Sequence, residues 1–125
     1  MKIFQKDELP IDALKGRGII RVVGKDSASD SKAMTVGYAL YSDEYGEMEP
    51  HHHAEETVVV TSSDKGYVEY GGEPDHLLYR AELKTGTVLH IPPNEWHVFK
   101  YGEGGHVEIV FIYGGTDNVR PEDNK

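Results

Sequence analysis

Hydrophobic and β-branched residues occur along this chain in short segments, each about as long as a strand. The segments are Ile19 to Val23, Met34 to Tyr41, Thr57 to Thr61, Tyr67 to Tyr70, Leu77 to Leu83, Thr87 to Ile91, His97 to Tyr101 and Val107 to Tyr113. Turn-forming clusters such as SSDKG, GGEPD and GEGG separate them at nearly regular intervals. No stretch keeps a 3.6-residue period, and only DELPIDALK near the start suggests a helical turn. The pattern predicts an all-β sandwich or barrel.

The length of 125 residues fits one domain, so we expect a single domain over 1–125 with a polar tail at about 116–125. The chain has no cysteine, which excludes disulfides, thiolate nucleophiles, zinc fingers and iron–sulfur clusters built on it. Histidine, aspartate and glutamate remain as strong metal ligands. Any metal is therefore expected to be held by nitrogen and oxygen.

Charge and hydropathy limit the partners. The net charge of -9, with 13 scattered lysines and arginines, would repel a phosphate backbone, so we expect no nucleic acid partner. The longest apolar segments are far shorter than a membrane span. The N-terminal MKIFQKDELP lacks the apolar stretch of a secretory signal, so the sequence predicts a cytoplasmic protein without a membrane partner. A small molecule is the expected ligand.

The stretch EPHHHAEET places three histidines just before two glutamates. In an extended strand His51 and His53 point to one side and His52 to the other. Because the apolar run TVVVT follows directly, one of the two glutamates is expected to enter the interior beside the histidines. A buried carboxylate needs a partner, and a divalent metal is an effective one. An exposed polar edge is the alternative interpretation of this segment.

A second segment, KTGTVLHIPPNEWHVF, carries Gly86, Pro92 and His97 at intervals of six and five positions. This spacing resembles the second conserved motif of the cupin superfamily. Asn94 stands where that motif has its second glycine, and asparagine is the next best residue for a left-handed backbone conformation. The first cupin motif is matched loosely by Gly46, by the histidine cluster and by a glutamate that directly precedes an apolar strand.

The resemblance, which covers residues 46–99, implies a cupin-type double-stranded β-helix, or jelly-roll barrel. It also implies one divalent metal ion inside the barrel, held by three histidines and one glutamate: His51, His53, Glu56 and His97. The spacing leaves three substitutions open, with His52 in place of a neighbouring histidine and Glu55 or Glu49 in place of the glutamate. Nitrogen and carboxylate ligands suit Fe, Mn, Ni, Zn or Cu. Because small cupins usually pair through a sheet edge, we expect a homodimer.

Strand parity extends the predicted site to the neighbouring positions. If His97 faces inward, Phe99 and Tyr101 lie on the same side, and Val58 and Val60 turn inward with the glutamate. Four further side chains are candidates for the pocket, with structural roles as the alternative. They are the hydroxyls of Tyr38 and Tyr113, Arg80 as a group for a substrate anion, and His90 as a pocket base or partner of a metal ligand.

Three functions are compatible with these residues. The first is a metal-dependent enzyme acting on a small polar molecule, with dioxygenase, isomerase or lyase type chemistry. The second is a non-catalytic cupin that binds or senses a small ligand. The third is a metal-free barrel with histidines at its rim. Fold and ligand set do not select the reaction. The four candidate ligands, together with the lack of a DNA-binding or signalling segment, favour the enzyme slightly.

Overall fold

The computed structural model describes residues 1–116, which form an antiparallel β structure with one short helix. The elements are η1 (Lys6–Glu8), β1 (Asp12–Leu14), β2 (Arg17–Val23), β3 (Met34–Ser42), β4 (Glu56–Glu73), β5 (His76–Glu82), β6 (Val88–Ile91) and β7 (His97–Gly114). The all-β architecture expected from the sequence is confirmed. The polar tail expected at 116–125 lies outside the described residues except for Thr116.

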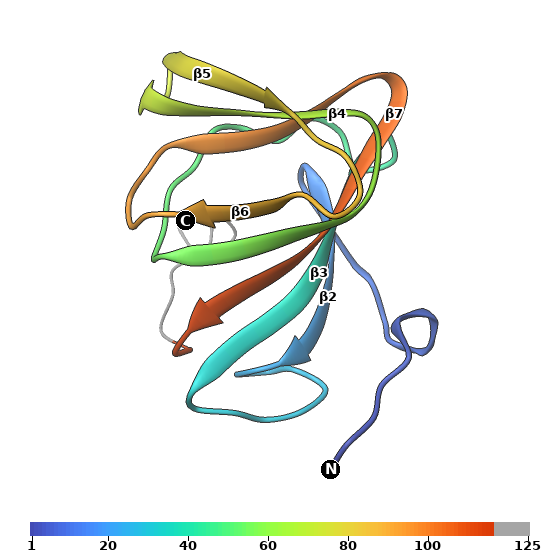
Figure 1. Cartoon of the computed structure of the whole chain (residues 1–125). Coiled ribbons are helices and arrows are strands. Elements are labelled where there is room, and N and C mark those ends of the chain that lie inside the picture. Colours follow the sequence, from blue (N-terminus) through green and yellow to red (C-terminus); the bar gives the residue numbers. More distant parts are fainter. Residues whose placement is uncertain (117–125) are drawn as a thin grey trace.

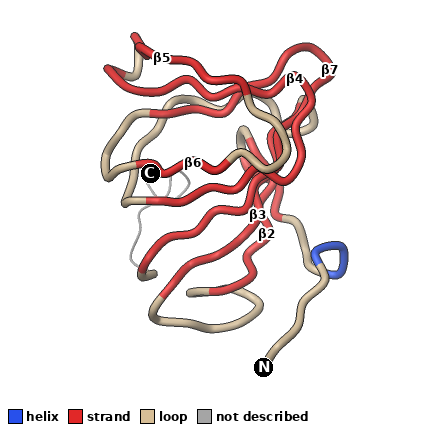
Figure 2. Tube along the Cα trace, viewed as in Figure 1, coloured by secondary structure: helices blue, strands red, loops and turns tan. Residues whose placement is uncertain are grey.

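The strands form two layers that share β4 and β7 (Figure 1). In the larger layer the pairing order is β1-β2-β3-β7-β4-β6. Only the second half of β7 and the first half of β4 belong to this layer. In the smaller layer the first half of β7 pairs with the second half of β4, which pairs with β5. Figure 2 shows the strands of both layers converging at one side and separating at the other. The fold is therefore a barrel-like pair of layers joined through one shared pair of strands.

The core lies between the layers and follows the alternation of each strand. In β4 the side chains of Val58 and Val60 are buried and those of Thr57 and Val59 are less so, as a period of two requires. Phe99 at the start of β7 is buried and Tyr101 packs against the core, as predicted from the parity of His97. The space between the layers is thus largely filled by apolar and aromatic side chains.

Two predicted turns are wrong, because SSDKG and GEGG lie within continuous strands. β4 and β7 each run for 18 residues and pair with each other through both segments. The register shifts between Asp64 and Gly66, and Lys65 and Gly104 adopt positive φ angles of 60° and 74°. Such irregularities bend a strand while its hydrogen bonding continues on either side. The turn-forming residues therefore produce a bend in a strand pair rather than two hairpins.

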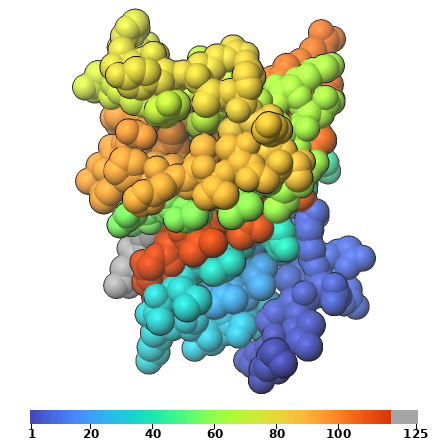
Figure 3. Space-filling model, viewed as in Figure 1, coloured from blue at the N-terminus to red at the C-terminus, as the bar shows by residue number. Residues whose placement is uncertain are grey.

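The helical turn expected over DELPIDALK is confirmed only in part. A 3-10 helix covers Lys6–Glu8, and Asp12–Leu14 forms the edge strand β1 instead. Leu9 is extended, with φ -99° and ψ 147°, as the residue before a proline prefers. Pro10 also lacks the N–H that a helix would need. In the space-filling view the N-terminal segment lies along one end of the larger layer (Figure 3).

Within residues 1–116, no helix has the length and apolar character needed to cross a membrane.

Close packing around Gly37 in β3 leads to a prediction about stability. A Cβ atom added there would lie 2.5 Å from the carbonyl oxygen of Ile20 and 2.6 Å from the Phe111 ring. We expect Gly37→Ala to lower the free energy of unfolding by about 1–3 kcal/mol, because backbone and ring must shift. Gly114→Ala is the control, since Gly114 is also in a strand and no atom lies within 4 Å of its added Cβ. Urea denaturation giving equal losses for the two variants would contradict this assignment.

Candidate metal centre

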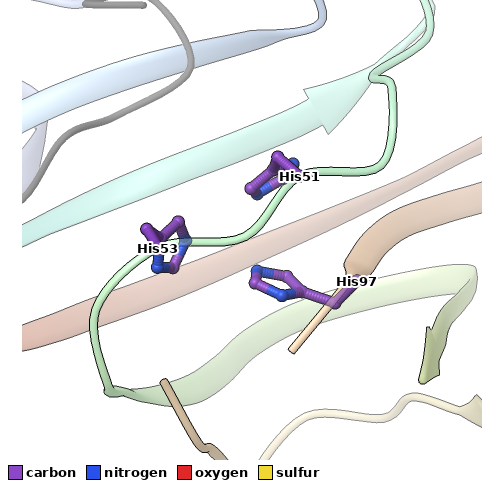
Figure 4. Close-up of side chains that lie close together, drawn as sticks. All are labelled: His51, His53 and His97. Carbon is purple, nitrogen blue, oxygen red and sulfur yellow. The ribbon is translucent and has the colours of Figure 1, made fainter. Parts of the chain in front are cut away.

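Three histidines from two distant segments meet inside the barrel. His51 and His53 lie on the chain that leads from β3 to β4, and His97 is the first residue of β7. One potential ligand atom from each lies within 4.8 Å of the others. The rings are 4.6 Å (His51 to His97), 4.9 Å (His53 to His97) and 5.4 Å (His51 to His53) apart between centroids. Figure 4 shows the three rings converging on a common space.

Backbone hydrogen bonds hold the two segments together at this point. The amide of His51 donates to the carbonyl of His97 over 3.0 Å, and the amide of His97 donates to the carbonyl of His51 over the same distance. The amide of Asn94 donates to the carbonyl of His53 over 2.8 Å. Asn94 has φ 64°, the left-handed conformation predicted from its position in the motif. The turn before β7 therefore fixes both segments against each other.

Each of the three rings is oriented by a hydrogen bond from Nδ1 to a nearby backbone carbonyl. The acceptors are the carbonyls of Glu49 for His51 (3.1 Å), Ala54 for His53 (3.0 Å) and Glu95 for His97 (2.8 Å). Because a carbonyl oxygen only accepts, each Nδ1 carries the proton and each Nε2 keeps its lone pair. Metal-ligating histidines are commonly oriented in this way. All three rings thus have the tautomer needed to bind a metal through Nε2.

Glu56 places a carboxylate beside these nitrogens. Its side chain is 4% exposed, and its Oε1 lies 3.4 Å from Nε2 of His53 and 3.8 Å from Nε2 of His97. Within residues 1–116, this Oε1 and the Nε2 of His97 have no hydrogen-bond partner although both are buried. The carboxylate accepts a hydrogen bond from the hydroxyl of Tyr113. Buried polar atoms without partners are rare, and a bound cation would satisfy both of these atoms.

Burial changes the protonation of the cluster. Removal from water lowers the pKa of His51 to about 3 and that of His97 to about 4, and each is lowered further by a neighbouring histidine. Removal from water also raises the pKa of Glu56 to about 7, against the effects of Tyr113 and Arg17. The pKa of Tyr113 is raised, first by burial and then by the charge of Glu56. Both histidines are consequently neutral at physiological pH, as metal ligands must be.

The space between these side chains is small. The cavity has a volume of about 20 Å³, enough for about one water molecule. Its wall contains the four predicted ligands together with one arginine and apolar or aromatic residues: Arg17, Ile19, Ala39, Tyr41, Phe99, Ile109, Phe111 and Tyr113. The donor set and the unpaired buried atoms fit a metal ion of ordinary size. That the four residues bind one stays a prediction.

The alternative ligands left open by the sequence lie outside this cluster. His52 is exposed, and its ring packs against Trp96 with centroids 4.4 Å apart. Glu55 is exposed and its Oε2 lies 2.5 Å from Nε2 of His90. The side chain of Glu49 is exposed as well. The structure therefore places His90 in a surface pair rather than at the cluster.

Of the other side chains that the sequence offered for the pocket, one lies at the histidine cluster and two lie away from it. Tyr113 lies at the site, with its ring 5.2 Å from that of His53, whereas Tyr38 packs near Lys6 with the ammonium nitrogen 5.7 Å from its ring centroid. Arg80 is exposed, bonds to Glu82 over 2.9 Å and stacks on Tyr67. Of the two positions that the sequence left open for Arg80, the structure thus shows the outer one.

Arg17 is the cation of the cavity wall, and it did not stand out in the sequence. Its side chain is only 6% exposed. The segment GRGII could have indicated that Arg17 points inward, because Arg17 and Ile19 are two positions apart and share a face of β2. An inward Ile19 therefore directs the arginine inward too.

Solved structures of other proteins share this architecture. The polyketide cyclase RemF from Streptomyces resistomycificus gives a TM-score of 0.71 at 17% identity, covering 98% of this chain and 89% of the cyclase. A protein from Planctomyces limnophilus gives 0.68 at 18% identity, covering 98% of this chain and 94% of that one. Hydroxypropylphosphonic acid epoxidase from S. wedmorenis gives 0.64 at 18% identity, covering 90% of this chain and 58% of the epoxidase.

These similarities decide the fold. The barrel is of the cupin type. No protein-family model matches the sequence, and no curated protein matches it either. At identities below 20% the likeness carries the fold alone, so the chemistry of this cupin barrel has to be argued from its own residues.

The raised pKa of Glu56 predicts a proton release on metal binding. At pH 6 a group with a pKa of about 7 is mostly protonated in the metal-free protein, and a metal must displace that proton. We expect Glu56→Gln to release about one proton fewer than the wild type at pH 6, and this difference to vanish near pH 8. Calorimetric titration with metal in two buffers of different ionisation enthalpy measures the released protons. Equal release by both proteins at pH 6 would show that Glu56 is not displaced by the metal.

Proposed function

We propose that this protein binds one divalent metal ion through Nε2 of His51, His53 and His97 and through the carboxylate of Glu56, and that it is an enzyme acting on a small polar molecule. The observation that carries the proposal is the set of buried, unpaired ligand atoms. Among the described residues 1–116, Nε2 of His97 and Oε1 of Glu56 have no hydrogen-bond partner, and the three rings are oriented with Nε2 toward a common point. An ion at this point would satisfy these atoms together.

Three imidazoles and one carboxylate suit Fe, Mn, Ni, Zn or Cu in the divalent state and leave one or two positions open. When bound, such an ion supplies Lewis-acid or redox chemistry to a small molecule beside it. One solved structure similar to this chain is that of FeII HppE, at 18% identity. This is compatible with iron here but does not select it.

The protein's own residues prepare the site for this role. The hydroxyl of Tyr113 holds the Glu56 carboxylate, and the three Nδ1 hydrogen bonds fix the imidazole rings. Phe99 and Phe111 line the cavity and make part of its wall apolar. Ligands held in this way need little rearrangement when an ion binds, and a dry wall strengthens electrostatic interactions within the cavity.

Binding without catalysis is the second candidate, and one observation favours it. The cavity of about 20 Å³ holds a water-sized group but no substrate. An enzyme therefore requires a side chain to move aside, whereas a metal-stabilised binding protein does not. Crystals grown with metal show which applies: a small molecule beside the ion supports the enzyme, and a filled, closed cavity supports the binding protein.

His97→Ala tests the metal site directly. We expect this variant to lose the metal, because His97 contributes the most buried of the proposed ligands, at 1% exposure. His52→Ala is the matched control, since His52 belongs to the same triplet of histidines but is exposed. Elemental analysis of protein purified without tag or chelator measures occupancy. The increase in melting temperature on adding metal should disappear in His97→Ala and persist in His52→Ala.

Full metal occupancy in His97→Ala would contradict the site. A larger loss in His52→Ala than in His51→Ala would mean that the register of the triplet differs from the structure. A wild-type protein that binds no divalent metal would favour the metal-free barrel.

We also propose that the protein is a homodimer. Ile112 and Val88 are exposed to 37% and 61% on the outer face of the larger layer, and β5 and β1 end their layers without a further strand within residues 1–116. Exposed apolar positions and free strand edges are common sites of pairing. Light scattering should give twice the chain mass of 14.0 kDa at micromolar concentration. A mass of one chain would contradict the dimer.

A further inference from the structure

A pocket lies between β5 and β6, which are edge strands of different layers. Within residues 1–116, β5 pairs only with β4, and β6 also pairs only with β4. Figure 1 shows β5 in the upper layer and β6 beneath it. The pocket has a volume of about 210 Å³, against about 20 Å³ for the cavity at the histidines, and His97 is the one residue that lines both. It is therefore a separate space that touches the metal centre only through His97.

The wall of this pocket is mostly apolar. Val68 on β4 and Ile91 on β6 are 3% and 6% exposed, and Leu89 packs against the same core. Tyr70 adds an aromatic surface, and its ring contacts that of Tyr79, its neighbour across the β4–β5 pair, with centroids 5.4 Å apart. The other lining residues are Ala81, Val88, His90, Glu95 and His97. Apolar pockets with a few polar groups are the usual binding sites of small molecules.

The volume of the pocket limits the size of its ligand. An apolar cavity of about 150 Å³ accommodates benzene, so a pocket of about 210 Å³ accommodates one ring with a small substituent. Drug-sized molecules need roughly 300 Å³ or more. Water would find few hydrogen-bond partners on this wall, and an apolar group that displaces such water gains affinity. The pocket therefore suits a molecule built on one ring.

The polar groups at the pocket determine which substituent the ring carries. Nδ1 of His97 is bonded to the carbonyl of Glu95, and Nε2 of His90 lies 2.5 Å from Oε2 of Glu55. The side chain of Glu95 is half-buried, and the described residues provide no hydrogen bond or ion pair for its carboxylate. A carboxylate accepts but does not donate, so its partner must carry a donor. Glu95 and the neighbouring Glu55 also repel an anionic substituent.

We propose that the pocket between β5 and β6 binds a small one-ring molecule whose hydroxyl or amino group donates a hydrogen bond to the Glu95 carboxylate. The ring packs against the aliphatic side chains of the wall and against Tyr70. No metal takes part in this binding, so the inference goes beyond the proposed function. It gives the barrel a second ligand site, which touches the proposed metal centre through His97.

The test titrates the full chain with three probes that differ in one group: 4-methylphenol, 4-methylbenzylamine and 4-methylbenzoate. Amide chemical shifts measured by NMR report both affinity and position. We expect the phenol, the amine or both to bind with the largest shifts in β5 and β6, and the benzoate to bind at least about tenfold more weakly. The stronger probe distinguishes a hydroxyl from an amino ligand. No binding, equal binding of the benzoate, or largest shifts elsewhere would overturn the proposal.

Ala81→Phe tests the position of the site by filling the pocket. Ala81 lines the pocket from β5, so the added ring should compete with the ligand and weaken the binding of the phenol and the amine by about tenfold or more. Leu78→Phe is the matched control, because Leu78 is 56% exposed on the same strand and does not line the pocket. Undiminished binding by Ala81→Phe would show that the ligand binds elsewhere.

Glu95→Gln tests the polar contact, and it also replaces Ala81→Phe if that variant does not fold. The amide keeps an acceptor but loses the charge. We expect the phenol and the amine to bind roughly threefold to tenfold more weakly, and the benzoate to bind more tightly than it does to the wild type. Glu73→Gln, at the exposed end of β4, is the control. Unchanged affinities in Glu95→Gln would contradict the role of Glu95.

Titrations of chelator-treated and metal-loaded protein distinguish this pocket from the metal centre. Both forms should bind the probes with similar affinity, because the pocket needs no metal. Probe binding that is lost on removal of the metal would place the probes at the metal centre, which overturns this inference and supports the proposed function. A wild type that binds no divalent metal but still binds the probes refutes the proposed function alone.

Discussion

The pairing of β4 with β7 is the interaction on which the rest of the structure depends. The two strands share 18-residue spans, and their pairing builds both layers of the barrel. Glu56 faces Tyr113 at one end of this pairing and Tyr70 faces His97 at the other. In a straight pair these ends would be roughly 45 Å apart. Because the pair bends, Oε1 of Glu56 lies 3.8 Å from Nε2 of His97. The site therefore forms where the two ends of one strand pair meet.

The site combines buried polar atoms with an apolar wall, which is costly for stability unless the atoms find partners. The Nδ1 atoms find them in backbone carbonyls, and Glu56 finds one in Tyr113. Nε2 of His97 and Oε1 of Glu56, which have no hydrogen-bond partner in the part of the chain that the structure describes, point toward the same space. Local violations of the rules for stable packing are typical of functional sites. Here the violation consists of nitrogen and carboxylate atoms of the kind that bind divalent metals.

A shared barrel does not imply a shared reaction. The similar structures include a polyketide cyclase and a phosphonic acid epoxidase, which are different enzymes on related folds. In this chain the wall of the cavity combines Arg17 with apolar and aromatic side chains around the histidines and Glu56. Side chains of this kind, rather than the ligand set, decide which molecule a barrel accepts.

The sequence by itself determined the all-β class, the common direction of His51 and His53, and the left-handed turn at Asn94. These features depend on residue type and on alternation along one strand, which local sequence reports directly. It did not determine that SSDKG and GEGG bend a continuous strand pair, because the same residues serve turns and bulges and only the partner strand selects between them. Nor did it separate Glu56 from Glu55, or Arg17 from Arg80, as the charged group inside. Either side of a strand can face the core, and the tertiary structure decides which side does by bringing the second layer to it.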